Sequence, residues 1–71
     1  MSELISHLKR WRSDAGLTQQ ELADRVGVSR KTINTVENEV FIPSTLLSLK
    51  LAAVLATSVE QLFELAPTQE H

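Results

Sequence analysis

Cysteine is absent from the 71-residue sequence, and aromatic residues are limited to Trp11, Phe41 and Phe63. Without cysteine the chain can form neither a disulfide nor a thiolate metal site. A chain of this length also buries only about 60% of the surface that its unfolded form exposes. We therefore expect one small domain that is stabilised by packing alone, including packing against a second copy.

Long apolar runs are also missing from the sequence. The longest, Leu51 to Ala56, is far shorter than the roughly 18 residues that a membrane-spanning helix needs. The first residues, Met1 to Glu3, contain no basic segment that leads into an apolar run, so no secretory signal is expected. These features predict a cytoplasmic protein without a membrane partner.

The net charge of −2 argues mildly against a polyanionic partner, because a phosphate backbone favours excess Lys and Arg. The charges are nevertheless unevenly distributed. Residues 1–38 carry six basic and five acidic side chains, whereas residues 39–71 carry one basic and four acidic side chains. Any nucleic acid would therefore bind to the first half of the chain.

Hydrophobic residues recur with helical spacing along the chain. Leu4, Leu8, Trp11 and Ala15 form the first buried stripe, and Gly16 ends this helix. No alternating run or internal repeat is present, so the pattern predicts five helices and no sheet, an all-α fold. The apolar stripes of the other four helices are Leu22, Ala23 and Val26; Ile33 and Val36; Leu47, Leu51, Val54 and Leu55; and Val59, Leu62 and Phe63.

Polar residues mark the helix starts. Thr18 with Glu21, and Ser58 with Gln61, are each spaced as a capping box, in which two side chains satisfy backbone N–H groups. Ser29 and Ser44 are further candidate N-caps, and Pro43 and Pro67 interrupt helices. The helical domain is expected to cover residues 1–66, followed by a short tail at residues 67–71.

The second and third helices are short and are separated by a tight turn at Gly27. Ala23 is small where the two helices would cross, and Ile33 and Val36 would hold the third helix to the core. This arrangement is typical of a helix-turn-helix motif. On the third helix, the polar side chains opposite Ile33 are Lys31, Asn34, Thr35 and Asn38, with Arg30 at the flank.

These residues together resemble the lambda repressor and Cro-like, or XRE, family of helix-turn-helix regulators. The resemblance covers roughly residues 4–65 and rests on the combined spacing of several short motifs. They are Gly16-Leu17-Thr18-Gln19-Gln20-Glu21-Leu22-Ala23, Val26-Gly27-Val28-Ser29-Arg30, Thr32-Ile33, Glu37-Asn38, Ile42-Pro43-Ser44 and Ser58-Val59-Glu60-Gln61-Leu62-Phe63. The family usually has glycine where this chain has Glu39 and commonly has glycine where it has Ala56.

The resemblance implies a five-helix domain that binds double-stranded DNA as a homodimer, on an operator with two half-sites. The exposed residues of the third helix would contact bases, and we assign this role to Arg30, Lys31, Asn34 and Thr35. Phosphate contacts are assigned to Gln19, Thr18, Asn38 and Ser29. Glu37 points toward the core side of its helix, where an ionised carboxylate needs a partner, and in the family this partner is Arg12.

A homodimer is also expected from size, since one recognition helix reads too few base pairs to select a site in a genome. The fifth helix is too short to bury all of its apolar side chains, and Phe41 adds apolar surface nearby. The predicted dimer interface consists of Val59, Leu62, Phe63 and Leu65.

Other functions are less well supported. An enzyme is not expected, because no nucleophile–base constellation or glycine-rich phosphate loop is present. His7 and His71 lack a second ligand at metal spacing, so neither a metal nor a cofactor is expected. The alternative function is an antitoxin-like or adaptor module that binds a protein through its acidic second half.

Overall fold

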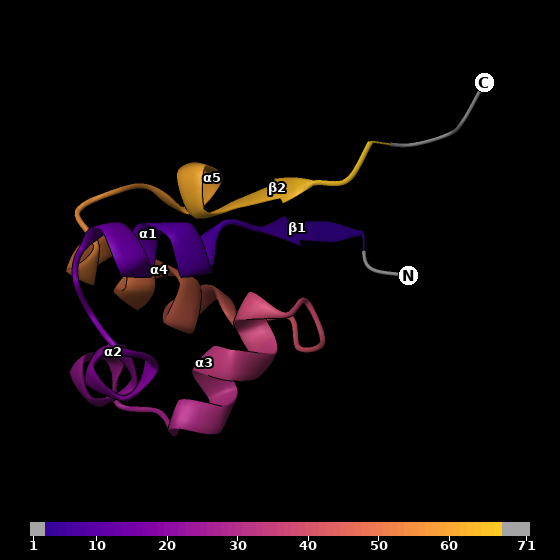
Figure 1. The fold of residues 1–71 in the computed structure, drawn as a ribbon. Coiled ribbons are helices and arrows are strands. Elements are labelled where there is room, and N and C mark those ends of the chain that lie inside the picture. Colours follow the sequence, from indigo (N-terminus) through magenta and orange to yellow (C-terminus); the bar gives the residue numbers. More distant parts are fainter. Residues whose placement is uncertain (1–2, 68–71) are drawn as a thin grey trace.

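The computed structural model describes residues 3–67, which form five helices and two short strands (Figure 1). Within this range, no helix is long and apolar enough to span a membrane. Of the predicted tail, residues 67–71, all but Pro67 lies outside the described residues. The elements in order are β1 (Leu4–Ser6), α1 (Leu8–Asp14), α2 (Gln19–Val26), α3 (Arg30–Glu37), α4 (Thr45–Val54), α5 (Val59–Leu62) and β2 (Phe63–Leu65).

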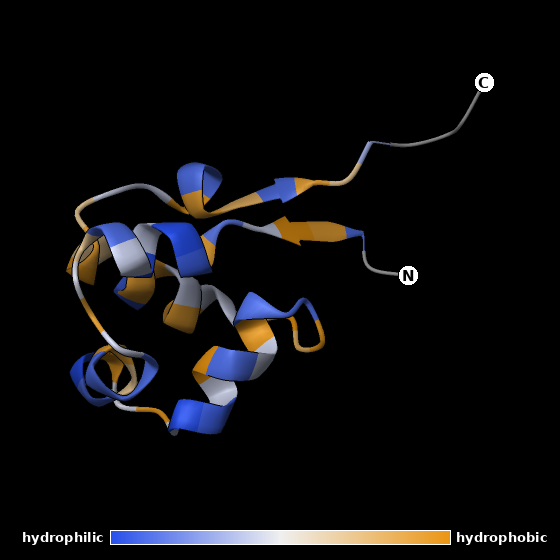
Figure 2. Cartoon of the chain, in the orientation of Figure 1, coloured by the Kyte–Doolittle hydropathy of each residue, from blue (hydrophilic) through white to orange (hydrophobic). Residues whose placement is uncertain are grey.

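One apolar cluster joins all five helices. Its centre is made of side chains with no exposed surface, contributed by every helix: Leu8, Leu22, Ile33, Leu51 and Leu62. Figure 2 shows that α1, α2 and α3 also carry many hydrophilic residues, whereas the strands and the loop before α4 are mostly hydrophobic. α1, α2 and α3 therefore bury one apolar stripe each and leave polar surface available for contacts with other molecules.

The helix starts follow the predicted caps. Thr18 and Glu21 form a complete capping box, in which the Glu21 N–H donates to Thr18 Oγ1 at 3.0 Å and the Thr18 N–H donates to Glu21 Oε1 at 2.8 Å. Ser58 accepts from the Gln61 N–H at 3.2 Å, which is one half of the box predicted there. Ser29 and Ser44 cap α3 and α4 in the same way, accepting from Thr32 and Leu47.

The prediction of a sheet-free fold is wrong. Leu4–Ser6 is a strand rather than the first turn of a helix, and it pairs antiparallel with Phe63–Leu65 in the register Leu4 to Leu65. The physical reason is that the backbone of Leu4–Ser6 bonds to a strand at the other end of the chain, a contact that local spacing does not indicate. The four-residue separation of Leu4 and Leu8 is therefore compatible with a helix but is not caused by one. Ala15, placed in the first buried stripe, is exposed just beyond α1.

Four of the residues between 3 and 67 adopt a positive φ. Gly16 and Gly27 do so after α1 and α2, where the absence of a Cβ makes the left-handed conformation inexpensive. Glu39 (φ 63°) and Ala56 (φ 56°) are the two positions at which the family usually has glycine. A left-handed conformation costs a non-glycine residue roughly 1–2 kcal/mol, so both positions store strain that neighbouring contacts must offset.

Candidate nucleic-acid interface

The turn between α2 and α3 fixes the direction of α3. Gly27 has φ 77°, and both its N–H and that of Val28 donate to the Ala23 carbonyl, at 2.9 and 3.0 Å. Ala23 is fully buried, which lets the two helices approach closely. Ser29 then caps α3, so the chain re-enters a helix immediately after the turn.

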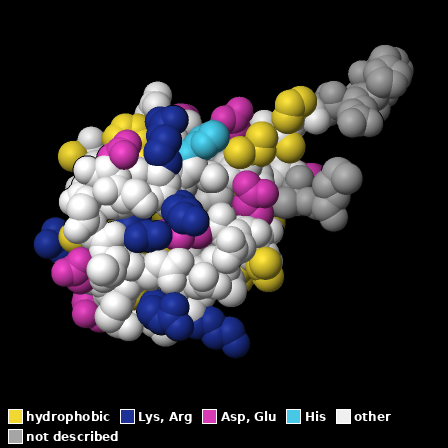
Figure 3. All heavy atoms as spheres, in the orientation of Figure 1, with side chains coloured by type: hydrophobic (Ala, Val, Ile, Leu, Met, Phe, Trp, Pro, Cys, Tyr) yellow, Lys and Arg dark blue, Asp and Glu magenta, His cyan; other side chains and the backbone are white. Residues whose placement is uncertain are grey.

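The packing of α3 determines which of its side chains face solvent. Ile33 and Val36 are buried, and on the remaining surface Arg30 and Lys31 are exposed while Asn34 is half-buried. Figure 3 shows basic side chains over α1 and over the end of the molecule where α2 meets α3. The beginning of α3 therefore presents two cations and an amide, which are donors suited to base edges and phosphates.

The hydroxyl and amide side chains assigned to DNA also have partners within the protein. Thr35 Oγ1 donates to the Thr32 carbonyl at 3.0 Å, and Asn38 Nδ2 donates to the Asn34 carbonyl at 3.0 Å. Thr35 therefore has only acceptor capacity left for a base, whereas Asn38 retains one N–H for a phosphate. The Thr18 oxygen accepts in the α2 cap, and its side chain also acts on the Glu21 carboxyl, so the Thr18 hydroxyl has partners within the protein as well.

A network of four side chains connects α1 with the beginning of α3. Arg12 Nε donates to Glu37 Oε2 at 2.5 Å, and Arg12 Nη2 donates to Glu37 Oε1 at 3.3 Å. Gln19 Nε2 donates to the same Oε1 at 2.9 Å, and Gln19 Oε1 accepts from Arg30 Nη1 at 3.2 Å. The two Glu37 oxygens accept these hydrogen bonds, so Glu37 fixes the Gln19 amide with its NH2 group toward Glu37 and its oxygen toward Arg30.

The network places Arg12 and Glu37 together in a mostly desolvated position, with side-chain exposures of 12% and 2%. Arg12 Nη1 also donates to the Leu17 carbonyl at 2.8 Å. The contact between Gln19 and Arg30 was not predicted from the sequence. No local signal reveals it, because the two residues begin different helices and meet only after the turn has formed.

At the beginning of α2, two hydrogen bonds act on Glu21. The backbone N–H of Thr18, and secondarily its side chain, hold the pKa of the Glu21 carboxyl below its ordinary value of 4.5. The carboxylate thus stays ionised at neutral pH and complements the partial positive charge of the helix N-terminus.

The single chain buries two of the four residues predicted for the dimer interface. Leu62 and Phe63 are buried in the core, with exposures of 0% and 7%, so they are not available to a second copy. Phe63 turns inward because it ends α5 and begins β2 with an extended backbone. Val59 is half-buried against the same core, and only Leu65 is strongly exposed, at 81%.

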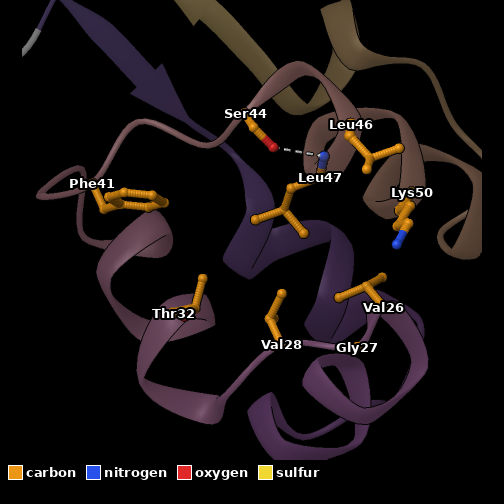
Figure 4. Close-up of a pocket in the computed structure, with 9 residues that line it drawn as sticks. All are labelled: Val26, Gly27, Val28, Thr32, Phe41, Ser44, Leu46, Leu47 and Lys50. Carbon is orange, nitrogen blue, oxygen red and sulfur yellow. Dashed lines mark hydrogen bonds between the residues drawn. The ribbon is translucent and has the colours of Figure 1, made fainter.

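A shallow apolar hollow of about 270 Å³ lies between the turn after α2 and the beginning of α4 (Figure 4). Lys50 is the one charged side chain among its lining residues, so it holds no acid–base pair. Among residues 3–67, no group of three His, Cys, Asp or Glu side chains is placed to bind a metal. The polar chemistry of α2 and α3 is therefore the better candidate for function.

Comparison with known proteins also identifies the chain as a helix-turn-helix protein. The model of the helix-turn-helix family matches residues 8–62. An uncharacterized helix-turn-helix-type transcriptional regulator of Archaeoglobus fulgidus is 40% identical over 58 residues, covering 82% of this chain and 83% of the relative.

Two solved structures share the fold. The chain is 30% identical to the clp gene regulator ClgR from Corynebacterium glutamicum, with a TM-score of 0.72 over 76% of this chain and 57% of ClgR. It thus spans little more than half of that protein. The chain is also 31% identical to SinR, the master regulator for biofilm formation from Bacillus subtilis, in a structure with DNA. That match has a TM-score of 0.69 and covers 75% of this chain and 86% of the SinR chain.

With the turn, the caps and the exposed face of α3, these similarities show that the chain belongs to the XRE-type helix-turn-helix transcriptional regulators, which are DNA-binding proteins and not enzymes.

Proposed function

We propose that this protein is a repressor that binds an inverted-repeat operator as a homodimer, with α3 in the major groove. The observation that carries the proposal is the exposed beginning of α3, where Arg30 and Lys31 project beyond a cap and a tight turn. The related SinR chain has been crystallised with DNA, which supports the same partner here.

The base contacts follow from the donors on α3. Arg30 or Lys31 donates to the acceptors of a guanine, and Asn34 pairs with an adenine or with a neighbouring phosphate. Thr35 lies next to them and offers an acceptor oxygen. Thr18, Gln19, Ser29 and Asn38 surround this region and contact the phosphate backbone, which sets the position of α3 without reading sequence.

The homodimer is proposed from affinity and from exposed apolar surface. One α3 reads only a few base pairs, whereas a two-fold dimer places two copies one helical turn of DNA, about 34 Å, apart. Leu65 is 81% exposed, and Val40 and Ile42, in the loop after α3, are 77% and 69% exposed. These residues and the partly accessible Val59 are the interface candidates once Leu62 and Phe63 are assigned to the core.

The proposed action is repression in the cytoplasm by occupation of the operator. A dimer of such domains, bound across two half-sites, blocks other proteins from the same DNA. It needs neither a metal nor a cofactor for that purpose.

The test is a gel-shift titration against genomic fragments at two salt concentrations, followed by selection from a random-sequence library. We expect saturable binding that selects an inverted repeat with half-sites one helical turn apart, and an affinity that falls as salt rises. A variant in which Arg30 and Lys31 are both alanine should lose the selection. Arg25→Ala is the matched control, since Arg25 is an exposed cation in the last turn of α2. Binding without sequence selection would instead favour the adaptor function.

A further inference from the structure

Glu39 occupies an unfavourable backbone conformation immediately after α3. Its φ is 63°, while Asn38 before it has φ −92°, so Glu39 alone makes the left-handed step that ends the helix. The Glu39 N–H donates to the Val36 carbonyl at 3.2 Å. Glycine would make this turn without strain, whereas Glu39 adopts it at a cost and brings a carboxylate to the end of α3.

The carboxylate of Glu39 contacts the distant strand β1. The Ser6 N–H donates to Glu39 Oε2 at 2.8 Å, which joins the segment after α3 to the beginning of the chain. This hydrogen bond directs the Glu39 carboxylate toward β1.

The geometry of the sheet explains why the Ser6 N–H is available. The His7 N–H donates to the Leu62 carbonyl, and Ser6 stands opposite Phe63 as the next pair. In an antiparallel ladder, alternate residues point their N–H groups away from the partner strand. Because His7 bonds to the partner strand, the N–H of Ser6 points to the outer edge of β1. An outer edge of a two-stranded sheet has no strand to bond with. Glu39 supplies the acceptor that a third strand would supply.

We propose that Glu39 is a positioning residue for α3, because its carboxylate fastens the end of the recognition helix to β1. The end of α3 is then held by two contacts. Glu37, the last residue of the helix, bonds to Arg12 of α1, and Glu39, two residues later, bonds to Ser6 of β1. This inference rests on the proposed function, since α3 carries the base-reading side chains. It opposes the simpler expectation that a carboxylate near the DNA backbone weakens binding by repulsion.

The chain contains a matched control. Ala56 is the other non-glycine residue with positive φ among residues 3–67, at 56°, and its methyl side chain can make no hydrogen bond. Ala56→Gly therefore removes backbone strain alone. Glu39→Gly removes strain together with the contact to Ser6, and Glu39→Gln removes the charge but keeps an acceptor oxygen.

The first measurement uses the free protein and follows hydrogen exchange at the Ser6 amide by NMR. We expect the Ser6 N–H to exchange markedly faster in Glu39→Gly than in wild type, with Glu39→Gln near wild type and Ala56→Gly unchanged. Equal Ser6 exchange in all four proteins would overturn the proposal, whether or not DNA binds.

The second measurement is the affinity for the selected operator. Glu39→Gly should bind about threefold to tenfold more weakly, the range for loss of one modest hydrogen bond, although it is relieved of strain. Glu39→Gln and Ala56→Gly should bind within about twofold of wild type. Tighter binding by Glu39→Gly and Glu39→Gln would overturn the positioning role in favour of repulsion. Absence of sequence-selective binding by wild type would refute the proposed function, while the Ser6 amide still reports on the contact.

Discussion

Arg12 of α1 and Glu37 of α3 form an ion pair through two donor nitrogens, with Arg12 Nε 2.5 Å from Glu37 Oε2. The Glu37 side chain is only 2% exposed, so the carboxylate depends on Arg12 and Gln19 for the hydrogen bonds that water would otherwise provide. The pair therefore contributes to holding the recognition helix on the core. It also orients Gln19, and through Gln19 it reaches Arg30.

Removal of the Glu37 carboxylate should destabilise the fold strongly. Glu37→Ala leaves Arg12 largely buried without its counter-ion, and breaking such a pair costs about 3–5 kcal/mol. Urea unfolding measures this loss. Glu60→Ala is the control, because Glu60 is an exposed carboxylate at the beginning of α5, and its effect should stay within about 0.5 kcal/mol. If the urea midpoint of Glu37→Ala lies within error of the wild-type midpoint, the ion pair does not contribute to the stability of the fold.

The capping box should make stability depend on pH. The folded state lowers the pKa of Glu21 below 4.5, so ionised Glu21 favours folding at pH values above about 4.5. This contribution is lost as pH falls through the lowered pKa of the folded state. Urea unfolding of wild type and Glu21→Ala from pH 7 to pH 3 should show the gap in stability between them narrowing with acid. A gap that stays constant across that range contradicts a contribution from the ionised form.

Asn34 and Gln19 should have separable effects on DNA recognition. Asn34→Ala should relax base preference at one position of each half-site, since each good base contact gives about 1–3 kcal/mol of discrimination. Gln19→Ala should weaken binding to all sequences alike through loss of a phosphate contact. Selection from a random library tests both. An unchanged consensus for Asn34→Ala would exclude a base contact, and a relaxed position for Gln19→Ala would assign Gln19 to the orientation of Arg30.

Leu65 should be a better probe of dimerisation than Phe63. Leu65→Glu places a charge on an exposed position of β2, whereas Phe63→Glu would place one in the core and unfold the domain. Sedimentation equilibrium at tens of micromolar should find wild type dimeric and Leu65→Glu mostly monomeric, with unchanged helix content by circular dichroism. A monomeric wild type would contradict the proposed homodimer, and a dimeric Leu65→Glu would place its interface elsewhere.

The starts of α2, α3, α4 and α5 could be predicted from the sequence because their determinants are local. A cap joins residues only three apart, as Thr18 and Glu21 are, and a glycine turn such as that at Gly27 depends on a single residue. The family resemblance added the partnership of Arg12 with Glu37, which spacing alone does not specify.

The errors concern contacts between distant residues. Leu4 follows the helical spacing of the residues after it, yet its backbone pairs with Leu65, which no local pattern indicates. The same pairing extends the backbone at Phe63 and turns it into the core. The contacts of Gln19 with Arg30 and of Glu39 with Ser6 are also non-local. The first joins the beginnings of α2 and α3, and the second joins the segment after α3 to β1, so both exist only in the folded chain.

The pairing of β1 with β2 also has a kinetic consequence. It closes a loop that spans nearly the whole described chain, whereas α2 and α3 meet across a single turn (Figure 1). Loop-closure entropy grows with the length of the loop, so contacts between α2 and α3 should form earlier in folding than the sheet does. The recognition helix is thus expected to belong to the early-folding part of the domain.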